Sequence, residues 1–431
     1  MADLDDWVTR RSEAVGMAYR DYLAARKAGA PRRFFSSRSH ALYFLNAVAP
    51  TKLVDGAWLY GVLQRWQEPD YLPLIQTYLE ELGDGVAGQN HVVLYKKLLA
   101  MHGCEHWRSL TEPHFVQGAI QLALACNAER FLPEIIGYNL GYEQLPLHLL
   151  ITSYELNELG IDPYYFTLHI TIDNASTGHA HKALRSLQQL LPLVGDTNAF
   201  YQRVIDGYRL NDLGANTMSV IESFDLEKEV LKIMRAKAGA GKNMHSNYCR
   251  VAGRTINDWL ADPHTMPDFL NALTGAGWIT RGEPAESSRF WHLIEGEHAE
   301  MFGVFSAYEQ QILRDWIASP SGHLPTEGKK AANHVRVPSF RARQRALAPM
   351  TATAAPEKVR HIGAARTAIR QQHASDDTND FTQELRTLEE QIGSLAGREV
   401  AMHALIQLMS PACHHTRAGL MATRVFKKLL A

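Results

Sequence analysis

Apolar residues recur at helical spacing along most of this chain, whereas the alternation of every second residue that is typical of strands is scarce. One example is a set of apolar residues spaced to cover a single helix face: Leu74, Ile75, Tyr78, Leu79 and Leu82. Proline repeatedly stands where a helix could begin, a position that suits its fixed φ and missing N–H. The pattern predicts an all-α protein.

The expected helical segments of the first half are separated by breaks that contain glycine or proline. They are residues 5–27, 37–48, 57–66, 73–82, 90–99, 113–125, 133–156, 163–191 and 197–210. The clearest breaks are Pro50–Gly56 and Gly83–Gly88. Asn90 follows the second break and is expected to cap the next helix, because an Asn side chain accepts a hydrogen bond from the first turn.

The same pattern divides the chain into four parts. Residues 1–215 are expected to form the main helical unit, and residues 216–319 a helical extension packed on it. Residues 320–380 are rich in Ala, Arg, Pro, Ser, Thr and Asp and poor in large apolar residues, which predicts a disordered linker. Helical spacing returns in residues 381–431, which predicts a C-terminal helical segment.

Composition narrows the classes of protein that fit. The 431 residues are 46% hydrophobic and 21% charged, ordinary values for a chain that buries a core. A net charge of −2 does not indicate a nucleic-acid partner. Four scattered cysteines argue against a disulfide framework, and the chain shows neither an apolar leader at its start nor an apolar run long enough to span a membrane. We therefore expect a cytoplasmic protein.

Residues 164–181 carry the most informative pattern for chemistry. His169 and Asp173 are four residues apart, so on a helix they differ by about 40° of rotation and face the same way. Their neighbours are strongly apolar, and a buried charge without a partner is costly. A metal ion would provide that partner. A His–Asp hydrogen bond or a surface ion pair is the alternative interpretation.

Two further segments place carboxylates beside apolar stretches. Glu81 precedes a Gly-Asp-Gly break and then His91, and the glycines allow the chain to bend between them. A solvated helix end with a capping loop would explain the same residues. Glu134 and Glu143 lie in an expected helix that is otherwise largely apolar, and Gly137 and Gly141, four residues apart, permit close approach of another helix. Here the alternative is a packing helix with glutamates at its rim.

Other histidines carry weaker signals. His414 and His415 follow Cys413, and the preferred interpretation is an exposed polar turn. His40 is the first clear histidine and has no distinctive neighbours, so a heme-binding histidine on the first helix is not favoured.

Taken together, the three carboxylate and histidine segments resemble the heme-oxygenase-like diiron oxidases, also called iron-containing redox enzymes, over roughly residues 35–215. The resemblance rests on the order of a carboxylate, a Gly-Asp-Gly break and a histidine, then a Gly-x-x-x-x-x-Glu helix, then Tyr-Phe-x-x-His-x-x-x-Asp. Residues 290–305 are similar to the longer members of this group. The resemblance implies a heme-oxygenase-like helical bundle that binds two non-heme irons and uses O₂ as co-substrate.

Carried over residue by residue, the resemblance implies iron ligands at Glu81, His91, Glu143, His169 and Asp173. The family pattern places a sixth ligand, a histidine, three residues after the aspartate, where this chain has Ser176. His179 is the candidate replacement and His181 the second choice. Because six residues are about 240° of a regular helix, His179 needs a kink or bulge to reach the metals. Glu134 is an alternative to Glu143 or an additional bridging carboxylate.

The resemblance implies an O₂-dependent oxidoreductase that oxidises a small organic molecule, of amino-acid-derived or acyl type. Two other functions fit the same residues: a helical interaction protein without turnover, and a metal-binding or self-modifying protein of the same fold. The expected partner is a small-molecule substrate, with a homodimer or a reductase as further candidates and with neither nucleic acid nor membrane.

Overall fold

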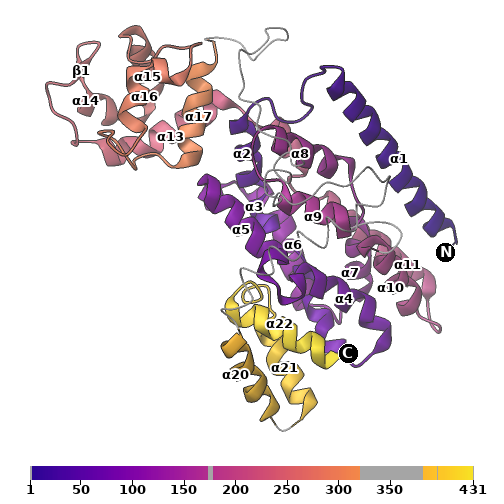
Figure 1. The fold of residues 1–431 in the computed structure, drawn as a ribbon. Helices are drawn as coiled ribbons and strands as arrows, with labels where there is room; N and C mark the ends of the chain where they lie inside the picture. Colours follow the sequence, from indigo (N-terminus) through magenta and orange to yellow (C-terminus); the bar gives the residue numbers. More distant parts are fainter. Residues whose placement is uncertain (1, 173–177, 321–381, 396, 431) are drawn as a thin grey trace, which may run out of the picture.

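The computed structural model describes residues 2–172, 178–320, 382–395 and 397–430, and helices dominate all of these ranges (Figure 1). Within them the strands are confined to one short antiparallel hairpin, β1 (Arg250–Val251) and β2 (Arg254–Thr255). The predicted all-α fold class is therefore confirmed. Among the helices in these ranges, none combines the length and the apolar character needed to cross a membrane.

The central body consists of helices from the first half of the chain. They are α1 (Ala2–Lys27), α2 (Arg38–Ala47), α3 (Ala49–Lys52), η1 (Ala57–Arg65), η2 (Pro69–Tyr71), α4 (Leu72–Glu81), η3 (Gly83–Gly85), η4 (Ala87–Gln89), α5 (His91–His102), η5 (His106–Ser109), η6 (Glu112–His114), α6 (Val116–Cys126), α7 (Leu132–Tyr142), α8 (Leu147–Glu158), α9 (Tyr164–Ile172), α10 (His179–Leu190), α11 (Thr197–Arg209) and η7 (Leu210–Asp212).

The remaining helices form an extension and a C-terminal group. The extension contains α12 (Thr217–Glu222), α13 (Leu226–Gly241), α14 (Ile256–Leu260), η8 (Pro263–Thr265), α15 (Met266–Gly275), η9 (Ala285–Ser287), α16 (Arg289–Ile294) and α17 (Ala307–Ala318). The C-terminal group contains α20 (Thr382–Gly393), α21 (Arg398–Leu408) and α22 (Arg417–Leu430).

Several expected elements differ from those observed. The single helix expected over 133–156 is wrong, because the chain forms α7 and α8 with Pro146 between them, and proline has no N–H to continue a helix. The break expected at 50–56 overlaps the single turn α3, which begins one residue earlier. By contrast, Asn90 caps α5 as predicted, and its side chain accepts from the Val93 N–H at 3.0 Å.

Helices α7 and α11 pack with their backbones almost in contact. A Cβ added at Gly137 would lie 1.8 Å from the Val204 carbonyl oxygen, and one added at Gly207 would lie 2.2 Å from the Glu134 carbonyl oxygen. Only glycine fits at either position. The close helix approach expected at Gly137 is confirmed.

Buried apolar residues form two large clusters in the central body. One gathers side chains of α2, α5, α8 and α9, such as Tyr95 and Phe166, together with the extension. The other gathers side chains of η1, α4, α7 and α11, such as Trp58 and Tyr138, together with α21 and α22. The extension and the C-terminal helices thus share the core of the central body.

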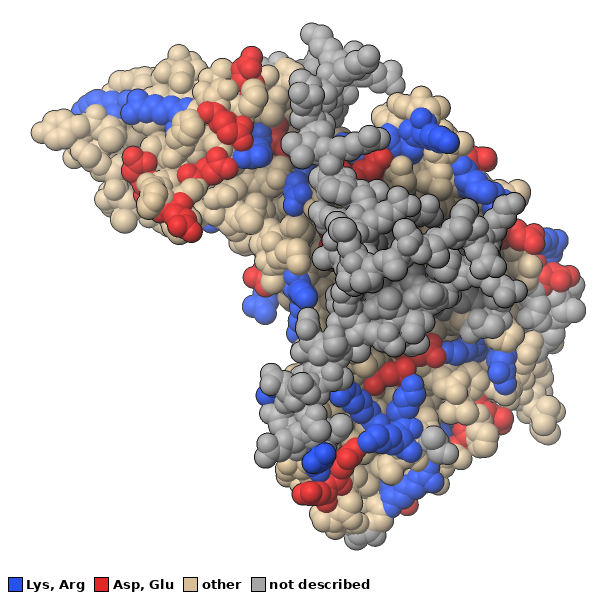
Figure 2. Space-filling model, viewed as in Figure 1, with Lys and Arg blue, Asp and Glu red and all other residues tan. Residues whose placement is uncertain are grey.

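The extension and the C-terminal helices lie at opposite ends of the central body in Figure 1. Helices α12 and α17 pack on α2, and α22 packs on η3. On the face drawn in Figure 2, acidic and basic side chains of the described residues are interspersed. The expected disordered linker, 320–380, lies outside the described residues except for Pro320.

Candidate metal centre

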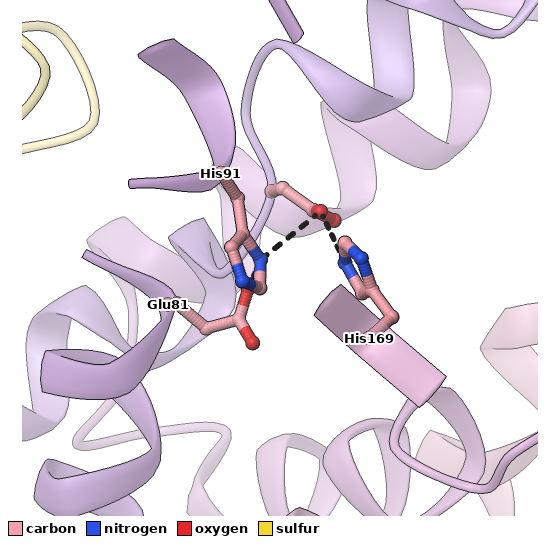
Figure 3. Close-up of side chains that lie close together, drawn as sticks. Glu81, His91 and His169 are labelled. Atoms are coloured by element: carbon pink, nitrogen blue, oxygen red, sulfur yellow. Dashed lines mark hydrogen bonds and ion pairs between the residues drawn. The ribbon is translucent and has the colours of Figure 1, made fainter. Parts of the chain in front are cut away.

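Four buried side chains from four different segments converge in the central body. Asp55, Glu81, His91 and His169 each offer a ligand atom, and these atoms all lie within 4.8 Å of one another. Asp55 is 1% exposed, Glu81 2%, His91 0% and His169 6%. Figure 3 shows that Glu81, His91 and His169 point toward one another. Two carboxylates and two imidazoles therefore face a common space.

Glu81 also belongs to a second group, formed with Glu143 and His179. The two oxygens of Glu81 face different histidines, since Oε2 lies 2.5 Å from His91 Nδ1 and Oε1 lies 3.3 Å from His179 Nδ1. His179 Nδ1 also lies 2.9 Å from Glu143 Oε2. Glu81 is thus placed as a carboxylate shared by two adjacent positions.

A tight turn brings Glu81 and His91 together although ten residues separate them. Glu81 is the last residue of α4 and His91 the first of α5, with η3 and η4 between them. Gly83 has φ +63°, and a Cβ there would lie 2.4 Å from the backbone nitrogen of Asn90. Since only glycine tolerates both this φ and this contact, the Gly-Asp-Gly break closes the turn.

Gly56, which follows Asp55, likewise allows a close approach between two segments. Its φ is +79°, and a Cβ there would lie 2.7 Å from Glu81 Cβ. The absence of a side chain at Gly56 lets the segment between α3 and η1 approach the end of α4. The Asp55 carboxylate consequently reaches the same space as Glu81.

Asp55 is held by several donors. Its Oδ2 accepts from the Tyr165 hydroxyl at 2.6 Å, and its Oδ1 accepts from the Tyr142 hydroxyl at 2.8 Å. Lys52 Nζ lies 3.7 Å from Oδ1. Burial alone would raise the pKa of Asp55, but the charge of Lys52 and the hydrogen bonds of His169 and His91 hold that pKa well below its usual value. Asp55 therefore stays ionised.

His169 is oriented by its own helix. Its Nδ1 lies 2.8 Å from the Tyr165 carbonyl oxygen, and because a carbonyl only accepts, Nδ1 carries a proton. Nε2 then faces Asp55 Oδ2 at 3.1 Å. A histidine fixed by a backbone carbonyl on one nitrogen and directed inward by the other is typical of metal ligands.

His91 lies beside two carboxylates, those of Glu81 and Asp55. Burial opposes its charged form, but the adjacent Glu81 carboxylate and then Asp55 raise the pKa of His91 to about 10. Burial alone would raise the pKa of Glu81, but the charge of His91 outweighs this effect, so the pKa of Glu81 is lowered. His91 Nε2 has no hydrogen-bond partner among the described residues. The two neighbouring carboxylates thus favour the charged form of His91, which balances part of their charge.

His179 is backed by a further carboxylate on its outer side. Its Nε2 lies 2.8 Å from Glu80 Oε2, and Lys182 donates to the other oxygen of Glu80. Burial would raise the pKa of Glu80, but hydrogen bonds from His179 and Lys182 lower it to about 2. An ionised Glu80 directs Nδ1 of His179 toward Glu81 and Glu143, as second carboxylates do behind metal-bound histidines.

The structure brings together five of the predicted ligands: Glu81, His91, Glu143, His169 and His179. Glu143 lies just past α7 as its C-cap, not inside a helix as expected. The reach of His179 does not come from a kink in one long helix, because His179 begins a separate helix, α10. Asp173 and Ser176 lie outside the described residues.

The two alternatives are not part of either group. Glu134 forms a two-pronged ion pair with Arg203, with both oxygens at 2.7 Å. His181 is half-buried on α10. The interpretation of His414 as part of an exposed turn is wrong, because this side chain is 2% exposed.

Asp55 was missed in the sequence because it stands in a short break between two apolar stretches, where an Asp-Gly pair is typical of an ordinary turn. No spacing to another histidine or carboxylate marks it. The one available signal is its position directly before a glycine that carries no side chain into the core.

The residues present fit a pair of metal ions. Three carboxylates and three imidazoles are buried side by side: Asp55, Glu81, Glu143, His91, His169 and His179. Mixed imidazole and carboxylate donors suit Fe(II), and burial of this many ionisable groups is costly without a cation. His91 Nε2 is buried and has no hydrogen-bond partner among the described residues. A buried polar atom of this kind calls for a partner, and a metal ion would be one.

Comparison with known proteins supports this assignment. Residues 42–213 match the family model described as iron-containing redox enzyme, which confirms the expected resemblance for this segment. The match contains every member of the two groups, and the extension and the C-terminal helices lie outside it. No curated protein and no solved structure matches the chain.

Proposed function

We propose that residues 42–213, the segment that matches the iron-containing redox enzymes, hold two non-heme irons and use O₂ to oxidise a small organic molecule. The observation that carries the proposal is the position of Glu81, whose two oxygens face two different histidines inside one buried group. A shared carboxylate is the feature that distinguishes a coupled pair of metals from two separate sites.

The two groups of residues would supply a separate set of donors for each iron. One iron would be held by Asp55, His91 and His169, and the other by Glu143 and His179, with Glu81 shared. Asp173 remains a further predicted ligand from the resemblance. When bound, Fe(II) supplies the electrons that reduce O₂, and the protein supplies position and a dry surrounding.

The chain's own residues prepare the site for that chemistry. Tyr165 and Tyr142 donate to Asp55, and burial raises the pKa of both hydroxyls, so they remain donors. Glu80 holds His179 and the Tyr165 carbonyl holds His169, so neither imidazole needs to reorient when metal arrives. Behind these two tyrosines lie further buried rings, Tyr95 against Tyr165 and Trp58 against Tyr142, which limit the access of water to Asp55 from that side.

A small substrate, of amino-acid-derived or acyl type, remains part of the proposal. The support is that the ligand residues are buried in a body whose core consists of two large apolar and aromatic clusters, which suits a compact organic molecule better than a large polar one.

The test is metal loading followed by exposure to O₂. The metal-free protein should bind two Fe(II) per chain without oxygen and then consume O₂ in proportion to the iron bound. His169→Ala should lose iron binding and O₂ consumption, and its stability should fall less than after a large core truncation, because water can fill the space that the ring leaves. The matched control is His298→Ala, an exposed histidine outside both groups.

The outcomes separate the candidate functions. Iron binding without O₂ consumption would indicate a metal-binding protein, and a permanent mass increase of the chain after O₂ exposure would indicate self-modification. A wild-type chain that binds no iron, or a His169→Ala variant that binds two irons and reacts at the original rate, would refute the proposal.

A further inference from the structure

The turn that joins Glu81 to His91 is covered by the C-terminal helices. Asn90, in this turn, is hydrogen-bonded to His414, although 324 residues separate them in sequence. His414 lies between α21 and α22 and is 2% exposed. The cover therefore comes from a part of the chain far outside the segment that matches the redox enzymes.

The amide of Asn90 connects His414 to the helix that begins with His91. Its Oδ1 accepts from the Val93 N–H at 3.0 Å, in the first turn of α5. Its Nδ2 donates to the Leu82 carbonyl at 3.2 Å and to His414 Nδ1 at 3.1 Å. Because both N–H groups and the carbonyl of this amide are used, its orientation is fixed.

His414 acts in this network as an acceptor. Nδ1 of His414 must be unprotonated to accept from Asn90, which requires a neutral ring. Burial, with the charges of His415, Lys96 and His91 nearby, lowers the pKa of His414 to about 3, so the ring is neutral throughout the physiological range. Because all hydrogen-bonding groups of the buried Asn90 amide are satisfied, this network favours one arrangement of the turn and His414.

Contacts of α22 with the rest of the turn are equally close. A Cβ at Gly85 would lie 2.4 Å from the Leu420 carbonyl oxygen, so the backbone of α22 rests directly on the glycine. Arg424 Nε donates to the Gly85 carbonyl at 2.9 Å, and Lys427 Nζ lies 2.7 Å from Asp84 Oδ2. Asp84 has φ +54°, an uncommon conformation for a residue other than glycine, and these contacts help to hold it.

From these contacts we infer that the C-terminal helices are a positioning element of the metal centre, in which His414 acts through Asn90 to hold the start of α5 and with it His91. The inference rests on the proposed function for its metal part, whereas the hold on the turn stands on the geometry alone. Loss of the His414 acceptor leaves one buried N–H of Asn90 without a partner, which costs free energy. We expect the turn to loosen so that this N–H can reach water.

The test compares three substitutions in the full chain. His414→Leu removes the acceptor and fills the space. His414→Asn retains an acceptor oxygen near the position of Nδ1. His403→Leu is the matched control, because His403 is an exposed histidine on α21. Arg424→Ala is a second test that leaves the buried position intact, in case His414→Leu does not fold.

Two measurements are made on each variant. Without metal, amide hydrogen exchange across residues 82–94 should be faster in His414→Leu than in wild type, slightly faster in Arg424→Ala and unchanged in His403→Leu. In a Co(II) titration followed by absorbance, His414→Leu should weaken the position that contains His91 by about tenfold, the lower range for residues behind a ligand. The Glu143 and His179 position should change less, and His414→Asn should restore most of the loss.

The results distinguish the inference from the proposed function. Wild-type affinity and wild-type exchange in both His414→Leu and Arg424→Ala would overturn the inference and leave the proposed function standing. Equal weakening in His403→Leu would also overturn it, because the effect would then be general. A wild-type chain that binds no Co(II) and no Fe(II) would overturn the proposed function, whereas faster exchange in His414→Leu would still establish the hold on the turn.

Discussion

Glu81→Gln is the substitution that tests most directly whether the two groups form one centre. Glutamine keeps the shape of Glu81 but replaces a charged, two-oxygen bridge with one neutral oxygen and an amide. In the structure the two carboxylate oxygens face His91 and His179 at 2.5 and 3.3 Å. A single substitution should therefore weaken both metal positions, although most of their other ligands are unchanged.

The magnitude follows from linkage between binding and folding. At a free metal concentration 100 times the Kd, each bound ion stabilises the folded state by about 2.7 kcal/mol, so two ions contribute about 5 kcal/mol. For a chain of this size, each kcal/mol raises the Tm by roughly 2 °C, so wild type should gain roughly 10 °C on loading. Glu81→Gln should gain less than about half of that, because at most one position remains occupied.

Without metal, the same substitution should change the Tm little. Glu81 is the largest influence that raises the pKa of His91, so its loss lets the ring deprotonate nearer to neutral pH, and a neutral ring needs no counter-charge. Removal of Glu81 also relieves its repulsion with Asp55. The two effects oppose the loss of the contact between Glu81 and His91.

The assay is thermal unfolding with and without Co(II), together with the number of ions bound. Glu134→Gln is the matched control, because Glu134 pairs with Arg203 near the surface and lies in neither group. Glu134→Gln should keep the full rise in Tm on Co(II) binding. A Glu81→Gln chain that binds two ions and shows the wild-type rise would refute the shared carboxylate.

Four further predictions follow from the geometry and the charges of the site. Gly56→Ala should lower the Tm and weaken Co(II) binding, since its methyl group would lie 2.7 Å from Glu81 Cβ at a φ of +79°; wild-type affinity in a folded variant would contradict this. Co(II) binding should tighten by about tenfold per pH unit between pH 6 and 8, because His91, with its pKa raised to about 10, must lose a proton to bind; isothermal titration in two buffers should detect that proton. The stability of the metal-free chain should instead fall as pH rises. Protonated His91 contributes stability that is fully present below about pH 6.5 and is lost as pH rises through about 10, which thermal unfolding at several pH values should show. Asp55→Asn should weaken Co(II) binding and also lower the metal-free Tm, because one of the two tyrosine hydroxyls then faces an amide NH₂ that cannot accept, at a cost of about 1.5–3 kcal/mol; a change in only one of the two readouts would contradict this double role.

The helices of this protein were largely predictable because each buries one face, and burial imposes helical spacing. The exceptions lie where a local feature outweighs the spacing. Pro146 separates α7 from α8 within a continuous apolar stretch, and α3 forms a single turn in a segment that spacing alone assigns to a break.

The candidate site was partly predictable. His169 stands inside α9, where spacing and apolar neighbours made it visible. Asp55 was missed since it stands between α3 and η1, in a short segment whose course depends on contacts with α4. His414 was misjudged because its partner, Asn90, is 324 residues away, and no local pattern records such a contact.

The position of most ligands at helix ends explains why they need support from outside their own helices. Glu81 ends α4, His91 begins α5, Glu143 follows α7 and His179 begins α10. The backbone of a residue in the middle of a helix is held by helical hydrogen bonds on both sides, whereas the backbone at a helix end depends on its cap and on the turn beside it.

A centre built from helix ends can bring its ligands from many directions, but each end must be fixed by something outside its own helix. Gly56 and Gly83 allow the ends to approach, Glu80 holds the ring of His179, and Asn90 with His414 holds the start of α5. The C-terminal helices then support the proposed centre, because polar groups of the turn between two of its ligands are satisfied from that side. A chain cut after residue 320 should for this reason lose metal affinity even if its central body stays folded.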